Sequence, residues 1–265
     1  CRGWAPVDTL FYAGNISATI SIKSVFSKHG ISLGRVNIDN ALFHLTTEPD
    51  GNGFHKSNIE RIFHLKKALT DPDADPPGGP EIFEISKVHI TDLNFRLNNF
   101  MESQRPPQQM GINYEDLDVM LENLSAKKLK FSGGVMSGIA EQIKVSEKSG
   151  YKATISGSCK AGMGKVLIDD LNIKDEWSDL DLRFLNMTFR NGLAFADFLN
   201  KVKIEARFRP SRVAITTVAY TGSAQLFGNE GIYDILRGHV LGPVSDMQVE
   251  KFVFSEQKSG MSGQI

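Results

Sequence analysis

Cysteine is scarce in this chain, and it has neither a long apolar run nor an excess of one charge sign. The 265 residues include 2 cysteines, 30 Lys+Arg and 31 Asp+Glu, so the formal net charge is -1. Two cysteines exclude a small domain stapled by several disulfides. The balanced charge argues against nucleic acid or a polybasic membrane surface as partner. No apolar run of about 18 residues predicts a transmembrane helix, and no signal peptide is indicated.

The two cysteines, Cys1 and Cys159, leave several interpretations open. Their number allows a bridge between them, but geometry decides whether one forms. Alternatively, Cys1 is the acylated first residue of a lipoprotein. Because residues 1–7 lead without a linker into a predicted strand, and the other end is as abrupt, we interpret the chain as a fragment of a longer protein.

Motifs that carry catalytic or metal chemistry are also missing. The six histidines do not fall into a metal-ligand spacing with cysteine or with one another. Residues 157–166 resemble a phosphate-binding loop, but Lys165 is followed by valine, and a strand is predicted where that loop needs a helix. Asp169 and Asp170 would point to opposite faces of a strand, so a hairpin turn is the better interpretation. With no nucleophile motif either, we expect neither an enzyme nor a metal or cofactor site.

What the sequence does contain is alternation of apolar and polar residues, which is typical of half-buried β-strands. Short turn-forming segments such as Lys148-Ser149-Gly150 separate the strands and favour antiparallel pairing. The predicted strands are residues 9–13, 16–22, 31–38, 41–46, 82–90, 93–97, 117–124, 126–131, 142–146, 151–157, 166–173, 180–189, 202–208, 213–220, 239–241 and 244–254.

Two segments show helical spacing instead. We expect one short helix over residues 56–69 and another over residues 193–202, where apolar residues recur at i, i+3, i+4 and i+7. The run rich in Pro, Gly and Asp over residues 71–80 predicts a loop. No lasting change in composition marks a second domain, so residues 1–265 are interpreted as one continuous β-region.

An internal repeat is the most informative feature. Residues 31–45 and 83–97 match position for position, with apolar residues at offsets 0, 2, 5, 7, 10, 12 and 14. The first step of three, at Gly34-Arg35, suits a β-bulge; the second, at Asp39-Asn40, suits a tight hairpin. Each copy is therefore predicted to be a two-stranded hairpin with its apolar side chains on one face. Such repeats are typical of a solenoid or an extended array.

These apolar residues form the candidate site. Two short helices cannot cover so many strands, so the sheet either folds onto itself or curls into an open groove that meets an apolar ligand. His44 and His89 lie off the apolar set and are expected to face solvent. The candidate lining residues are Ile31, Leu33, Val36, Ile38, Phe43, Leu45, Phe83, Ile85, Val88, Ile90, Leu93, Phe95, Leu97, Leu180, Leu182 and Phe184.

In order and number, the segments of this chain resemble the AsmA-like repeats of TamB-family proteins. The resemblance covers nearly the whole chain, and no single motif within it is catalytic. The segments that carry it are residues 8–13, 16–22, 31–45, 196–202, 209–214 and 237–247.

The resemblance implies a long antiparallel sheet curled into a taco-shaped apolar groove. It implies a periplasmic location in diderm bacteria, with an inner-membrane anchor outside this segment. The implied functions are passage of phospholipid between the inner and outer membranes and assistance to a protein that assembles outer-membrane β-barrels. The alternative is a closed β-solenoid or sandwich that acts as a scaffold or adhesin and binds protein through its exterior.

Overall fold

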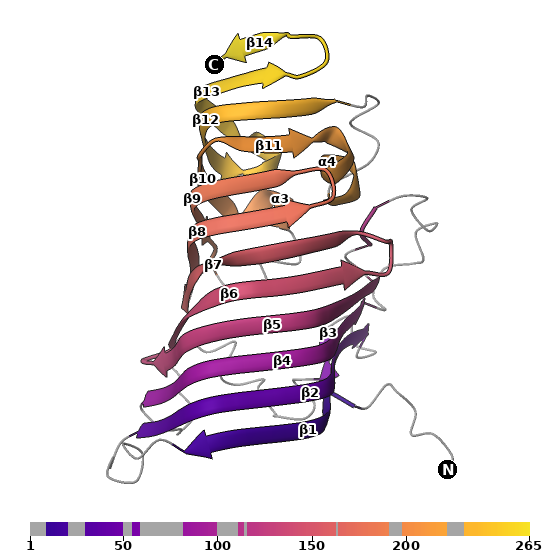
Figure 1. Cartoon of the computed structure of the whole chain (residues 1–265), viewed down its shortest axis with the longest axis vertical. Coiled ribbons are helices and arrows are strands. Elements are labelled where there is room, and N and C mark those ends of the chain that lie inside the picture. Colours follow the sequence, from indigo (N-terminus) through magenta and orange to yellow (C-terminus); the bar gives the residue numbers. More distant parts are fainter. Residues whose placement is uncertain are drawn as a thin grey trace.

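A single curled β-sheet, dominated by antiparallel pairs, makes up most of the computed structural model (Figure 1). The structure describes residues 9–20, 30–49, 55–58, 82–99, 111–113, 116–162, 164–190, 198–221 and 231–265. This confirms the mainly-β fold class predicted from the alternation. The strands are β1 (Phe11–Ile20), β2 (Gly30–Pro49), β3 (His55–Ser57), β4 (Ile82–Asn99), β5 (Asp116–Ser132), β6 (Val135–Glu147), β7 (Lys152–Gly162), β8 (Lys165–Asp175), β9 (Asp179–Thr188), β10 (Lys203–Phe208), β11 (Ser211–Ala214), β12 (Ile232–Pro243), β13 (Gln248–Glu256) and β14 (Ser262–Gln264).

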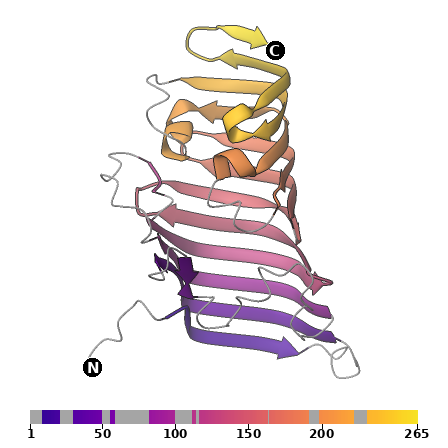
Figure 2. The same ribbon diagram turned by 180° about the vertical axis from the view of Figure 1, so that it is seen from behind.

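Helices are few and short in the described residues. They are α3 (Phe198–Lys201), α4 (Ile215–Thr221) and the single 3-10 turn η3 (Val244–Asp246). Figure 2 shows the helical segments on the rear of the C-terminal third of the sheet. The end of the helix predicted over residues 193–202 corresponds to α3, whereas residues 191–197 lie outside the described residues. Of the helix predicted over residues 56–69, residues 56 and 57 belong to β3, Asn58 is helical, and residues 59–69 lie outside the described residues.

The strand predicted over residues 213–220 is wrong beyond its second residue. β11 ends at Ala214, and the chain continues as α4 in spite of its β-branched residues. Tertiary hydrogen bonds hold this segment: the Thr217 hydroxyl donates to Asp175 at 2.7 Å and lies 2.7 Å from the Ser178 hydroxyl. Contacts of this kind override β-propensity, which depends strongly on context.

The strands follow chain order along the sheet, β1-β2-β4-β5-β6-β7-β8-β9-β10-β12-β13-β14, with β3 and β11 as side branches. Antiparallel pairing throughout is nevertheless wrong at one place. β2 and β4 pair in parallel from Gly30 opposite Ile82 to Thr47 opposite Asn99, so the two copies of the repeat lie side by side in register. The 32 residues between these strands are long enough for the crossover that a parallel pair requires.

The repeats are continuous strands and not the predicted hairpins. Asn40 and Asp92, at the second step of three, have φ angles of 53° and 54° inside β2 and β4. Asn and Asp tolerate this left-handed conformation better than other side-chain-bearing residues. A two-residue type I′ turn needs positive φ at two successive residues, whereas here one residue changes the phase and the strand continues.

The first step of three is a bulge, as predicted. Between the Ala18–Val36 and Ile20–Leu33 pairs, two residues of β2 lie opposite Thr19 alone. The Thr19 hydroxyl accepts a hydrogen bond from the Arg35 amide at 2.7 Å, and a Cβ on Gly34 would lie 2.6 Å from the same oxygen. Glycine is therefore required where the Thr19 side chain fills the bulge.

Similar irregularities recur across the sheet, between β5 and β6, β6 and β7, β7 and β8, and β9 and β10. Asp170, placed in a hairpin turn by sequence, lies inside β8 with φ 52°. Bulges and left-handed residues bend strands and increase their twist, which allows a long sheet to curl. A true type I′ geometry occurs at Gly133-Gly134, with φ 56° and 71°, where β5 turns back into β6.

Candidate functional site: a continuous apolar face

An unbroken row of aliphatic residues crosses eight neighbouring strands on one face of the sheet. Residues directly opposite each other in neighbouring strands place their side chains on the same face. Each residue of the row is paired directly with the next one, and no polar residue interrupts the row. This aliphatic row consists of Ile16, Ile38, Ile90, Leu124, Ile143, Ile155, Ile173 and Leu180, one from each of β1, β2, β4, β5, β6, β7, β8 and β9.

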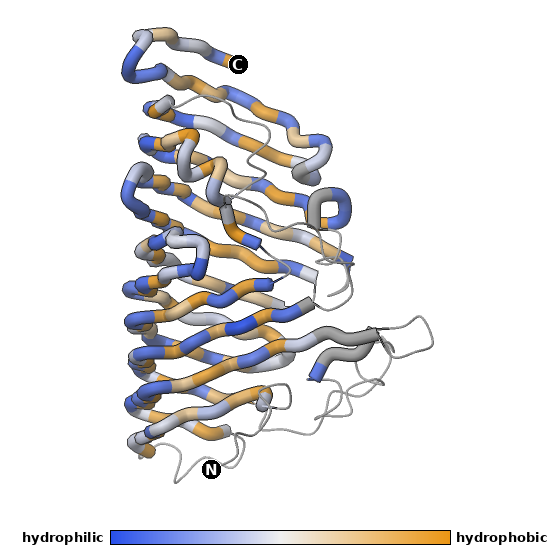
Figure 3. Tube along the Cα trace, turned by 90° about the vertical axis from the view of Figure 1, so that its right-hand side faces the viewer, coloured by the Kyte–Doolittle hydropathy of each residue, from blue (hydrophilic) through white to orange (hydrophobic). Residues whose placement is uncertain are grey.

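Further rows of apolar residues run beside the aliphatic row and form an apolar face together with it. Phe11 opposes Phe43, which opposes Phe95, and the rings of Phe43 and Phe95 stack with centroids 6.0 Å apart. On the other side of the aliphatic row, a third row of smaller residues runs through Val36, Val88 and Ala126. Figure 3 shows the alternation of apolar and polar residues along the strands that generates this face. We call the surface that contains these rows the apolar face.

The opposite, polar face is covered by hydrogen-bonded side chains from adjacent strands. Asn94 donates to Asp118 at 2.8 Å, Thr91 donates to Asp39, and Asn172 donates to Asp179 at 3.0 Å. A polar face of this kind needs no further layer of protein. The two faces of the sheet therefore differ in chemistry.

Large side chains on the apolar face are not fully buried in the N-terminal half of the sheet. The core residues there are small, such as Val36, Val88 and Ala126, each 8% exposed. All eight residues of the aliphatic row retain solvent exposure, and Ile16 on β1 is 56% exposed. A second protein layer over this face would reduce such values to a few per cent.

Full burial of large side chains is found toward the C-terminal third. Leu171 and Leu182 are each 4% exposed and form a cluster with Ala206 and Val240. At one end of the neighbouring strands, the ring of Tyr220 in α4 stacks on Trp177 at 5.2 Å and lies 6.1 Å from Tyr151. The sheet is thus more enclosed there than over β1 to β5.

The structure places the candidate lining residues from β2 and β4 on the apolar face, together with Leu180 and Leu182. Phe184 is the exception. It opposes Arg207, whose guanidinium carbon lies 5.9 Å from the centre of its ring, while the adjacent Leu185 packs with the buried cluster. Because the sheet has a bulge between Leu182 and Leu185, strict alternation from Leu182 assigns Phe184 to the wrong face.

Sequence reasoning missed much of the apolar face. Strands β1 and β5 to β8 contribute as many residues as the repeats do, and their alternation was a sufficient signal for strands. The sequence did not show the register in which these strands pair with one another and with the repeat. His44 was also placed wrongly, because it is only 6% exposed and its Nε2 lies 2.6 Å from Asn98 Oδ1. His89 retains some exposure and contacts the Ser125 hydroxyl at 3.2 Å.

Cys159 lies on the apolar face, opposite Gly138 on β6 and Ile168 on β8. Partial burial raises the pKa of its thiol, because the apolar surroundings disfavour the thiolate. A raised pKa makes this thiol a poor nucleophile. Within the described ranges, no three His, Cys, Asp or Glu side chains are arranged to hold a metal ion.

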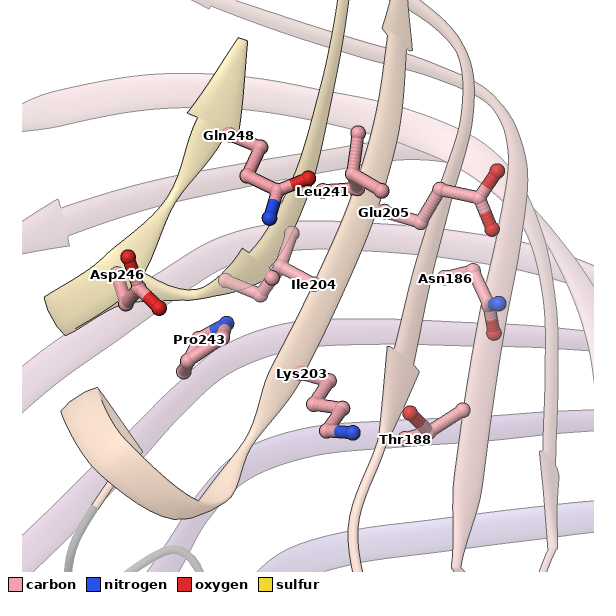
Figure 4. A pocket seen from close by; sticks show the side chains of 10 residues that line it. Asn186, Thr188, Lys203, Ile204, Glu205, Leu241, Pro243, Asp246 and Gln248 are labelled. Atoms are coloured by element: carbon pink, nitrogen blue, oxygen red, sulfur yellow. The ribbon is translucent and has the colours of Figure 1, made fainter.

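A shallow hollow of about 390 Å³ lies at the end of β9, β10, β12 and β13 (Figure 4). It is lined by residues of mixed character, including Lys203, Glu205 and Gln248. Lys203 and Glu205 alternate with Ala206 of the buried cluster and lie toward the polar face. The hollow therefore lies mainly on the polar side, although Ile204, which packs against the buried cluster, also lines it, and it brings together no recognisable catalytic set.

Comparisons with family models, with curated proteins and with solved structures return no match. Of the helices that the structure describes, none has both the length and the apolar character needed to cross a membrane. The fold defines a class, a long curled β-sheet with one apolar and one polar face. The chemistry of those two faces carries the argument about function.

Proposed function

We propose that the apolar face lines a groove that binds the acyl chains of phospholipids and lets them pass along the sheet. The observation that supports this most is the aliphatic row, which is continuous over eight strands and retains solvent exposure. With strands about 4.8 Å apart, the row extends over roughly 34 Å. A bilayer's hydrocarbon core is about 30 Å thick and holds two layers of acyl chains, so one chain fits within the row.

Energetics favour a conduit over a store. Burying a 16-carbon acyl chain is worth roughly 0.8 kcal/mol per methylene, about 12 kcal/mol relative to water. A bilayer supplies nearly the same free energy, so transfer between bilayer and groove is close to neutral. The groove removes the aqueous barrier between two membranes, and no catalytic residue is required for that.

The setting of this activity rests on the resemblance to TamB-family repeats. We propose that the protein works in the periplasm, anchored to the inner membrane, and passes phospholipid between the two membranes. The same resemblance supports a role in assembling outer-membrane β-barrel proteins together with a barrel assembly protein. The closed scaffold or adhesin is less well supported, because its apolar side chains would be buried throughout.

A charge placed in the middle of the aliphatic row tests the proposal. In Ile90→Asp, and in Phe95→Asp on the same strand, we expect lipid crosslinking to fall at least several-fold while the strands still form. A single carboxylate in a partly wet groove stays hydrated, whereas in a closed core it would cost several kcal/mol. Circular dichroism, thermal melting and a photo-crosslinkable phospholipid give the three readouts.

His89→Asp is the matched control, since it places the same charge one residue away on the polar face of β4. It should leave lipid crosslinking unchanged. Native mass spectrometry of the unmodified chain should recover bound phospholipid. Unfolding of Ile90→Asp, or a well-folded Ile90→Asp that crosslinks lipid normally, would contradict the conduit.

A further inference from the structure

Three cations occupy one row on the polar face, in directly opposed positions of three adjacent strands. Arg35 on β2 opposes Lys87 on β4, and Lys87 opposes Lys127 on β5. Their strand neighbours Val36, Val88 and Ala126 are buried on the apolar face, so the three cations project from the other side. Like charges directly opposed across strands are destabilising, and here they occur twice in succession.

Two other cations of the polar face meet carboxylates instead. Lys130 lies 3.0 Å from Glu84, and Arg96 lies 3.2 Å from Asp118. Within the cationic row, Lys127 alone has such a partner among the residues that the structure describes: it donates to Glu141 on β6. Arg35 and Lys87 make no ion pair with any described residue. Among the described residues, the row thus has fewer carboxylate partners per cation than these two pairs have.

The pKa of the Glu141 carboxyl reflects the excess of positive charge at this place. The hydrogen bond from Lys127 lowers the pKa of the Glu141 carboxyl most, and the charges of Lys127 and Lys87 lower it further. Lys87 therefore acts across two strands, and among the described residues this one carboxylate leaves most of the positive charge of the row unbalanced.

We propose that Arg35, Lys87 and Lys127 bind an anion that carries at least two phosphate groups. Strands are about 4.8 Å apart, so the three cations span about 10 Å. One phosphate reaches two neighbouring cations, and two linked phosphates reach all three. Arg and Lys are the side chains that bind phosphate in proteins, Arg through its planar fork and Lys as a point charge. Binding would replace the repulsion within the row by attraction to the ligand.

Titration with inorganic pyrophosphate at low salt tests the site on the full chain. We expect binding to the unmodified chain and a loss of about tenfold in affinity for Lys87→Gln, because one charge-assisted contact disappears. The matched control is Lys144→Gln. Lys144 is an exposed lysine of the polar face whose cross-strand neighbours are Asn123 and Thr154. Its affinity should stay within about twofold of the unmodified chain.

Thermal melting without any anion provides a second readout. Lys87→Gln should melt at a higher temperature than the unmodified chain, and added sodium chloride should shrink the difference by screening. Lys144→Gln should melt like the unmodified chain. If Lys87→Gln melts no higher than Lys144→Gln, the row is not repulsive and the proposal is overturned.

The phosphate groups can belong to a soluble anion or to lipid headgroups, and vesicles distinguish the two. Sedimentation with phosphatidylglycerol vesicles, but not with phosphatidylcholine vesicles, that is lost in Lys87→Gln would assign a headgroup source. Pyrophosphate binding without vesicle binding would assign a soluble one. The proposal is overturned if neither pyrophosphate nor phosphatidylglycerol vesicles bind, or if Lys87→Gln binds them as well as Lys144→Gln does. Since the polar face is separate from the apolar face, these outcomes leave the proposed acyl-chain groove untouched.

Discussion

A polar side chain satisfies backbone hydrogen-bonding groups of β2 that lie beyond the first residue of its neighbouring strand β1. Asn58, 2% exposed, lies beside β2 just beyond the point where β1 begins. Its side-chain amide donates to the His44 carbonyl at 2.6 Å and accepts from the Thr46 amide at 3.2 Å. One side chain therefore replaces the backbone groups that a longer β1 would have supplied. Buried backbone groups require such partners.

We expect Asn58→Ala to lower the free energy of unfolding by about 2 kcal/mol, because a buried carbonyl and a buried amide both lose their partner. Asn37→Ala is the control, since the Asn37 side-chain amide also donates a hydrogen bond, to the Ser17 hydroxyl at 3.1 Å, but in an exposed position. Its effect should stay within about 0.5 kcal/mol. Urea unfolding of both variants measures the difference, and equal effects would show that Asn58 does not perform this role.

At the level of the elements, single residues with positive φ set the length and phase of the strands. Asn40, Asp92, Lys128, Asp170 and Lys251 each lie inside a strand with φ between 50° and 54°. Each lets its strand bend without ending. β2 and β4 thereby reach 20 and 18 residues and keep their apolar side chains on one face over their whole length.

Asp92 offers a direct test of this mechanism, because its side chain is exposed. Asp92→Val should destabilise the chain by about 2 kcal/mol, since a β-branched residue strongly disfavours the left-handed region. Asp92→Gly should stay within about 0.5 kcal/mol, because glycine adopts this conformation freely. Equal melting temperatures for the two variants would contradict a left-handed residue at this position.

At the scale of the whole molecule, the described residues form a sheet one strand thick over much of its length, with opposite chemistry on its two faces. Most small domains bury their apolar face under a second layer. Here β1 to β5 keep large aliphatic and aromatic side chains partly exposed, whereas the cluster around Leu171 and Leu182 is closed. The proposed groove therefore has an open N-terminal half and a more enclosed C-terminal third.

Cys159 reports on the occupancy of the apolar face. In a Cys1→Ser chain, a maleimide should label Cys159 more slowly than a free thiol at the same pH, because its pKa is raised by burial. The rate should still increase about tenfold per pH unit between pH 7 and 8, as the thiolate fraction grows. Phospholipid with long acyl chains should slow labelling further. The water-soluble headgroup alone should have no effect, and equal rates with and without lipid would count against occupancy at β7.

Much of the fold followed from local pattern alone. Alternation predicts the strands, and the matching offsets of residues 31–45 and 83–97 predict that both copies present the same face. The bulge at Gly34-Arg35 was also predicted, because a step of three must be absorbed somewhere if the face is to stay apolar. These features depend on side-chain period, which any stretch of the chain carries by itself.

Only the tertiary structure decided how the pieces pair. The parallel neighbours β2 and β4, the strand that continues through Asn40, and the helix at Ile215–Thr221 all depend on contacts between residues far apart in sequence. The same holds for Phe184, whose face is set by a bulge against β10. Sequence by itself determined that one face of the sheet is apolar. Register, which joins separate strands into one aliphatic row, is a property of pairs of strands, and so it emerged only from the assembled sheet.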